Sequence, residues 1–166
     1  DVKFKNAYFQ KYKNLWHHGD YAEVTKNRGF IIYGRSDATL NPGGVRLGTA
    51  EIYSVVDKFK EIKESIVVGQ DWDNDVRIIL FVVLIDKVKL DKILINRLKI
   101  QIRKNASPRH VPSKIIVVTD IPRTKNGKIV ELSVKNVIDN RQVKNLEALA
   151  NPNVLEEYKN LSELSY

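Results

Sequence analysis

The sequence predicts a small α+β fold in which about three helices pack with one small sheet. Two observations support this. Short apolar runs bounded by glycine, proline or polar turns indicate strands, and apolar side chains at helical spacing indicate amphipathic helices between those strands. A chain of 166 residues with 43% hydrophobic and 29% charged residues can bury the core of one domain, but hardly of two full domains.

The first half of the chain begins with a strand and a turn. Residues 29–34 are a short apolar run between two glycines, which indicates a strand. Residues 39–47 place a Pro-Gly-Gly turn between two extended pieces, as in a tight hairpin. A helix is expected next, capped by Thr49. Its apolar side chains recur at helical spacing: Ile52, Val55, Val56 and Phe59.

Two strands and a second helix follow. Residues 65–70 and 78–85 read as strands joined by the polar turn 71–75, and the second is apolar enough for the centre of a sheet. A helix is expected over residues 91–104, ended by Pro108 and Pro112. Its expected buried face consists of Ile93, Leu94, Leu98 and Ile102.

The last predicted elements are a strand over residues 114–118 and a third helix over residues 130–138. The helix is expected to turn three side chains inward: Leu132, Val134 and Val137. No repeat or low-complexity linker interrupts this order, so the helices and strands are expected to share one compact domain.

Composition excludes several classes of protein. The chain lacks cysteine, which excludes disulfides and thiolate metal sites and fits a cytoplasmic protein. No apolar run approaches the roughly 20 residues that span a bilayer, and the first residues lack the apolar core of a signal peptide. The histidines show no metal-ligand spacing, so we expect no metal site: His17, His18 and His110.

The net charge of +8 allows two interpretations. A basic surface attracts nucleic acids, membranes or small polyanions such as nucleotides, whereas charge dispersed along a chain is usually a solvated surface. A basic nucleic-acid-binding module stays open as an alternative. It would require aromatic residues interleaved with basic ones on one face, and the sequence shows none, so we expect neither nucleic acid nor membrane as a partner.

The loop 121–129 carries the strongest local signal for chemistry. Pro122 fixes its entry, and Asn126-Gly127 permits a turn that pushes Lys128 outward. An ammonium group on such a turn is a flexible point charge that can contact a carboxylate and a phosphate oxygen together. Alone, the motif also fits an ordinary exposed loop, and it lacks the pattern of a Walker phosphate loop.

Three motifs in order resemble the adenylate-forming superfamily, which includes acyl-CoA synthetases, firefly luciferase and peptide-synthetase adenylation domains. Residues 16–20 (Trp-His-His-Gly-Asp) look like its Gly-Asp motif. Residues 34–37 (Gly-Arg-Ser-Asp), with residues 44–52, look like its hinge and adjoining hairpin. Residues 122–128 look like its terminal catalytic-lysine motif. The combination is far more specific than any one motif.

Further segments narrow the resemblance to the acetoacetyl-CoA synthetase family: residues 35–46, 107–112 and 148–152. The chain departs from the wider superfamily at three positions. An acidic residue is common where this chain has Ala38, Glu is frequent in place of Tyr53, and Ser is frequent in place of Asn126. A related ligase for acetate or propionate stays open as an alternative, because the residues that select the acyl group lie outside this sequence.

The resemblance implies an ATP-dependent acid–thiol ligase with two half-reactions. Acetoacetate and ATP would give acetoacetyl-AMP and diphosphate, and CoA would then take the acyl group after a lid domain rotates. ATP and CoA would be substrates, with Mg²⁺ entering with ATP. Residues 1–35 would end the N-terminal AMP-binding domain, and residues 36–166 would be the mobile C-terminal lid with a family-type tail. We expect a fragment of a longer enzyme, inactive without its N-terminal domain.

The resemblance also assigns nucleotide contacts. Lys128 would stabilise the charge that grows on the α-phosphate during adenylation. Asp20 would accept hydrogen bonds from the ribose hydroxyls, Arg35 would contact ribose or phosphate, and Arg46 would contact a phosphate. The alternatives are an Asp that only forms a turn after Gly19 and arginines in surface ion pairs.

The remaining assignments concern CoA and the hinge. Gly44 would line the pantetheine tunnel, Arg103 would meet the CoA nucleotide, and Asp37 would be the hinge. Each has a structural alternative: a hairpin glycine, an arginine favoured at a helix C-terminus, and a turn aspartate. Arg109 and His110 have no role that the sequence predicts.

Overall fold

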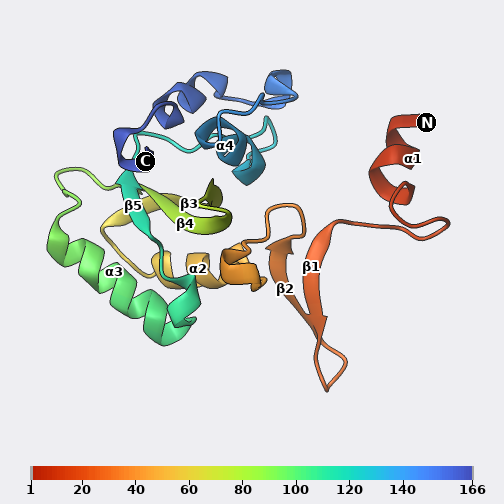
Figure 1. Ribbon diagram of the computed structural model, residues 1–166, viewed down its shortest axis with the longest axis horizontal. Helices are drawn as coiled ribbons and strands as arrows, with labels where there is room; N and C mark the ends of the chain where they lie inside the picture. Colours follow the sequence, from red (N-terminus) through yellow and green to blue (C-terminus); the bar gives the residue numbers. More distant parts are fainter. Residues whose placement is uncertain (1, 166) are drawn as a thin grey trace.

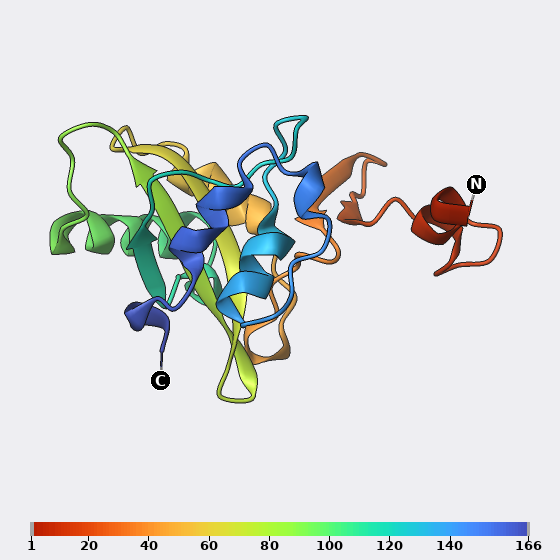
Figure 2. The same cartoon turned by 90° about the horizontal axis from the view of Figure 1, so that it is seen from above.

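A computed structural model describes residues 2–165 and shows two unequal parts (Figure 1). The smaller part contains α1 (Val2–Phe9) and an antiparallel pair of strands, β1 (Asp20–Val24) and β2 (Phe30–Arg35). In Figure 2, α1 projects far from the rest of the molecule. None of the helices in residues 2–165 has both the length and the apolar character needed to cross a bilayer.

The larger part is built on a second sheet with the strand order β3-β4-β5. β3 and β4 pair antiparallel, and β5 pairs parallel to β4 after a crossover through α3. The strands are β3 (Ile62–Trp72), β4 (Asp75–Leu84) and β5 (Lys114–Val117), and the helices are α2 (Thr49–Val56), α3 (Lys92–Asn105) and α4 (Glu131–Ile138).

Side chains of β4 are buried on both faces of this sheet. Ile78, Leu80 and Val82 face a core formed with α2 and α3. Ile79 and Phe81 face a second core formed with α4 and the C-terminal tail. Figure 1 shows α3 and α4 on opposite sides of the sheet. This alternation is the period of a strand, and it confirms the predicted central position of the second strand.

The C-terminal tail completes the second core. It consists of short 3₁₀ turns at residues 146–148, 152–158 and 162–164, which sequence patterning did not predict. Leu155 and Tyr158 are fully enclosed against the sheet. The guanidinium of Arg77 donates a hydrogen bond of 2.8 Å to the carbonyl of Leu164, which holds the end of the tail on the sheet.

The α+β fold class and most elements are confirmed, including the turn at residues 39–47, where Leu40 and Leu47 exchange backbone hydrogen bonds of 3.0 and 2.9 Å. The single predicted sheet was wrong, because residues 20–35 form a separate one. Thr49 was wrongly expected as the helix cap. Gly48 occupies that position, and its N–H donates to the Glu51 carboxylate at 3.3 Å.

Two side chains predicted to be inward are exposed, Ile93 by 70% and Leu132 by 46%. In each case the neighbouring buried stripe is complete without the residue. α3 contacts the core through Leu94, Leu98 and Ile102, and α4 through Val134 and Val137. A stripe with spacing of three or four residues leaves the residue beside it at the solvent boundary.

Candidate active site

Lys128 lies at the end of a tight turn in the loop between β5 and α4. The backbone N–H of Thr124 donates to the carbonyl of Lys128 at 2.8 Å, and the N–H of Gly127 donates to the carbonyl of Thr124 at 2.8 Å. Gly127 has a φ of +78°, which favours glycine at this position. The Lys128 side chain is exposed, as the sequence predicted.

The stem of this loop is fixed by contacts on two sides. The guanidinium of Arg123 forms an ion pair of 2.9 Å with Glu64 on β3 and donates to the carbonyl of Gly127 at 3.1 Å. The backbone of Arg123 accepts from the N–H of Ala150 at 2.8 Å, so the tail pairs with the loop. A mobile lysine side chain is therefore carried on an anchored backbone.

The segment between the two sheets brings together three predicted residues. Arg35 donates two hydrogen bonds to Asp37, at 2.8 and 2.9 Å, and lies opposite Asp20 in the β1–β2 register. Asp20 contacts the imidazole of His18 at 2.6 Å. The hydrogen bonds from Arg35 lower the pKa of Asp37, and those same bonds raise the pKa of Arg35. Asp20, Arg35 and Asp37 thus form one charged group.

Arg46 lines a different hollow of about 380 Å³ between the β1–β2 hairpin and α2. Its guanidinium carbon lies 6.0 Å from the ring centre of Tyr21. His110 also lines this hollow but is only 4% exposed. Its ring nitrogens contact Glu51 at 3.0 Å and Ser107 at 2.8 Å. His110 therefore connects α2 to the segment after α3, a role that sequence patterning missed.

The predicted CoA contacts lie on separate elements. Gly44 is the last residue of the 3₁₀ turn Pro42–Gly44, with a φ of +75°, and an added Cβ would meet no atom within 4 Å. In this structure, backbone conformation alone explains the glycine. Gly44 also lines a hollow of about 580 Å³ beside the β3–β4 turn. Arg103 is exposed in the last turn of α3.

A partly buried carboxylate near the lysine loop was not predicted. Glu131, the first residue of α4, accepts a hydrogen bond of 2.6 Å from the hydroxyl of Tyr53. The same hydroxyl accepts from the N–H of Val67 on β3 at 3.0 Å. Burial raises the pKa of Glu131 and raises the pKa of Tyr53 well above its usual value. A charged residue three positions after Lys128 reads as solvated in a sequence, which is why patterning missed it.

Among the described residues, Arg35, Arg46 and Lys128 could contact an anionic ligand, and the Asp20 carboxylate could accept hydrogen bonds from hydroxyl groups. Within residues 2–165, no group of three or more His, Cys, Asp or Glu side chains could hold a metal ion. The structure brings Asp20, Arg35 and Asp37 together, and it leaves Arg46, Lys128, Gly44 and Arg103 at separate positions. A nucleotide or CoA site that used all of these residues would therefore need contacts from another part of the protein.

Comparison with known proteins shows which proteins this chain is similar to. Residues 51–128 match the AMP-binding enzyme C-terminal domain. The acetoacetyl-coenzyme A synthetase of Rhizobium meliloti (strain 1021) is 57% identical over 98% of this chain and 25% of its own length. The acetoacetyl-CoA synthetase of Xenopus tropicalis is 45% identical over 98% of this chain and 24% of its own.

A solved structure agrees with these sequences. The acetoacetyl-CoA synthetase from Streptomyces lividans superimposes with a TM-score of 0.87 at 37% identity, over 98% of this chain and 25% of that protein. The chain thus spans about a quarter of the length of the relatives it matches. Residues 51–128 thus match the AMP-binding enzyme C-terminal domain, and nearly the whole chain is similar to the C-terminal part of acetoacetyl-CoA synthetases.

Proposed function

We propose that this chain is the C-terminal part of an ATP-dependent ligase that converts acetoacetate and CoA to acetoacetyl-CoA, AMP and diphosphate. The observation that carries the proposal is Lys128, an exposed lysine on an anchored loop, at the end of the segment that matches the AMP-binding enzyme C-terminal domain. Acetoacetate as substrate rests on the named relatives. The location proposed is cytoplasmic.

The first half-reaction forms a mixed anhydride. A carboxylate oxygen of acetoacetate attacks the α-phosphorus of ATP, the bond to the β-phosphate bridging oxygen breaks, and diphosphate leaves. Negative charge grows on the α-phosphate oxygens, and the Lys128 ammonium stabilises it there. Mg²⁺ enters with ATP and is held mostly by residues outside this chain, since residues 2–165 offer no acidic cluster.

The second half-reaction transfers the acyl group. The CoA thiolate attacks the carbonyl carbon of acetoacetyl-AMP, and AMP leaves with the electron pair of the broken C–O bond. In this step Gly44 leaves room for the pantetheine arm, and Arg103 contacts a phosphate of the CoA nucleotide. Lys128 has no role here, because the lid has rotated.

The remaining groups bind the nucleotide and permit the rotation. Asp20 accepts hydrogen bonds from the ribose hydroxyls, Arg35 contacts ribose or phosphate oxygens, and Arg46 contacts a phosphate. Asp37 is the hinge: a change in its backbone torsions moves its carboxylate relative to Arg35, with which it now forms two hydrogen bonds. The rotation therefore frees Arg35 for another anion.

We place the boundary between two domains at this hinge. Residues 1–35 end the N-terminal AMP-binding domain, and residues 36–166 form the mobile lid. The separate β1–β2 sheet and the self-contained core around β4 support the division. The N-terminal domain of the same polypeptide is the partner of both parts, and neither nucleic acid nor membrane is required.

Substitution of Lys128 by Ala in the full-length enzyme tests the proposal. Diphosphate formation from ATP and acetoacetate should fall at least about 100-fold, because a preorganised charge at a transition state contributes this much. Acetoacetyl-CoA formation from supplied acetoacetyl-AMP should stay within about threefold of wild type.

The matched control is Lys125→Ala, which removes another exposed lysine from the same loop and leaves its backbone hydrogen bond to Ala148 intact. Both half-reactions should survive in this variant. Equal losses of both half-reactions in Lys128→Ala would refute the assignment of Lys128 to adenylation.

A further inference from the structure

The free edge of β3 is covered by side chains in place of another strand. β3 is an edge strand, because the sheet order is β3-β4-β5. At alternate residues its outward backbone groups have side-chain partners. The N–H of Val67 donates to Tyr53, the carbonyl of Gly69 accepts from the ammonium of Lys135 at 2.7 Å, and the N–H of Asp71 donates to Asp139 at 3.1 Å.

Tyr53 lies on α2, whereas Lys135 lies on α4 and Asp139 is the residue that caps the C-terminus of α4. Lys135 and Asp139 contact the edge directly, and Glu131 contacts it through the hydroxyl of Tyr53. We call Glu131, Lys135 and Asp139 the polar stripe. Their spacing of four residues advances about 6 Å along a helix. Two residues of a strand advance about 6.6 Å, so the helix and the edge stay matched over three consecutive positions.

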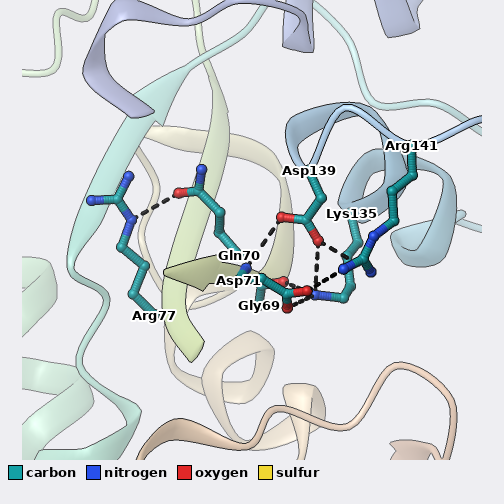
Figure 3. Close-up of polar contacts among 7 residues, drawn as sticks. All are labelled: Gly69, Gln70, Asp71, Arg77, Lys135, Asp139 and Arg141. Atoms are coloured by element: carbon teal, nitrogen blue, oxygen red, sulfur yellow. Dashed lines mark hydrogen bonds and ion pairs between the residues drawn. The ribbon is translucent and has the colours of Figure 1, made fainter. Parts of the chain in front are cut away.

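The middle and end of the polar stripe are also balanced in charge (Figure 3). The ammonium of Lys135 lies 2.7 Å from the Asp71 carboxylate and 3.0 Å from that of Asp139. Arg141 contacts Asp71 and lies 3.6 Å from Asp139. Two carboxylates thus face two cations, and hydrogen bonds from Lys135 and Arg141 lower the pKa of Asp71.

Stability alone does not account for this arrangement. The apolar side of α4 already buries Val134 and Val137 in the second core. Apolar contacts tolerate small sliding or rotation of a helix. Side chains that bond to particular backbone groups of β3 instead specify one position of α4 along the strand. The ion pairs of Asp71 with Lys135 and Arg141 are partly exposed and contribute little net stability. For enclosed polar groups such as the Asp139 carboxylate, fixing a register is the best-attested use.

We propose that the polar stripe fixes the position of α4 along β3 and thereby positions Lys128, a role that we call the register lock. The contact of the stripe nearest to Lys128 is the one between Glu131 and Tyr53. This rests on the proposed function, in which Lys128 acts only in adenylation. α4 begins three residues after Lys128, so a shift of Glu131 along β3 moves the base of the lysine loop. Tyr53 and Glu131 are positioning residues, because they reach the reaction only through Lys128.

Two conservative variants of the full-length enzyme test the lock. Tyr53→Phe removes the hydroxyl that joins Glu131 to Val67, and should lower the turnover of adenylation about tenfold, the scale of a small misplacement of a catalytic group. The KM for ATP, and the rate of acetoacetyl transfer from supplied acetoacetyl-AMP to CoA, should change less than twofold. Glu131→Gln keeps an oxygen that accepts from Tyr53 and should stay near wild type, whereas Glu131→Ala should match Tyr53→Phe.

The matched control is Arg97→Gln, which removes a charged contact of 2.6 Å to Glu61 on the far side of the sheet and should alter neither half-reaction. Rates are normalised to folded enzyme. Equal losses of both half-reactions in Tyr53→Phe, or a Glu131→Gln variant as impaired as Glu131→Ala, would overturn the lock. Normal adenylation in Lys128→Ala would refute the proposed function itself, whereas normal adenylation in Tyr53→Phe beside a defective Lys128→Ala would reject the lock alone.

Discussion

The two sheets of this chain differ in how completely they bury their apolar side chains. In the three-stranded sheet, β4 lies between two cores, and Phe81 is 0% exposed. In the two-stranded sheet, Phe30 is 73% exposed, and other large side chains of the hairpin are also exposed: Val24, Ile31 and Ile32. Several exposed large apolar side chains on one short hairpin are typical of a surface that contacts another part of a protein. This contrast supports the proposed division, in which residues 36–166 form the lid and residues 1–35 belong to another domain.

The apolar side chains of α1 are also incompletely buried. Its aromatic side chains contact one another and the loop that follows, with ring centres of Tyr8 and Trp16 4.1 Å apart. Phe4 also meets Trp16, at 5.7 Å. Phe4 and Trp16 remain about half exposed, so this cluster is a partial core. In the proposed full-length enzyme, we expect the N-terminal domain to cover both the cluster and the hairpin.

The largest expected effect compares one phenylalanine from each sheet. Phe81→Ala should lower the free energy of unfolding by about 3–5 kcal/mol, because it leaves a cavity against β4 and Tyr158. Phe30→Ala should change it by less than about 0.5 kcal/mol in this chain, since the ring is already exposed. Urea denaturation of both variants measures the difference, and comparable losses would show that the hairpin has a core of its own.

The same contrast explains what the sequence could predict. Local patterns predicted most helices and strands of the larger part, because alternation and helical spacing report burial: β4 and the stripe Leu94, Leu98 and Ile102 were predicted correctly. They wrongly placed Ile93 and Leu132 inward and missed the 3₁₀ turns of the tail. Patterns failed at residues 2–24. An incomplete fold shows no regular split between buried and exposed side chains, so α1 and β1 were not predicted.

Site residues were predictable where a motif carries them and unpredictable where only the tertiary fold does. The position of Lys128 at a turn followed from Asn126 and Gly127, and the structure has that turn. By contrast, no motif or periodicity marked Glu131, in the predicted third helix, or Asp139, directly after it, as part of a site. Their burial depends on the edge of β3, which lies 60 or more residues earlier, and on the spacing match between a helix and a strand.

A second prediction concerns the junction between the two parts. Asp37→Pro would fix φ near −65° and prevent the torsion change that a hinge requires. In the full-length enzyme, overall acetoacetyl-CoA formation should fall about 100-fold, as expected when a conformational step fails, while diphosphate formation in a single turnover should fall only severalfold.

Asp37→Gly is the matched control for that variant. It removes the same carboxylate from Arg35 but keeps the torsions free, so overall activity should recover to within about tenfold of wild type. If Pro and Gly variants were equally impaired, the ion pair with Arg35 would be the important feature, and Asp37 would not be the hinge.

The smallest effect gives the most direct test of the division into a complete and an incomplete part. Residues 36–166 alone should unfold in one cooperative transition, with a free energy of unfolding within about 1 kcal/mol of that of residues 1–166, because a two-stranded hairpin adds little stability by itself. Urea denaturation followed by circular dichroism measures both. A loss of more than about 3 kcal/mol, or of cooperativity, would contradict the claim that the larger part is self-contained.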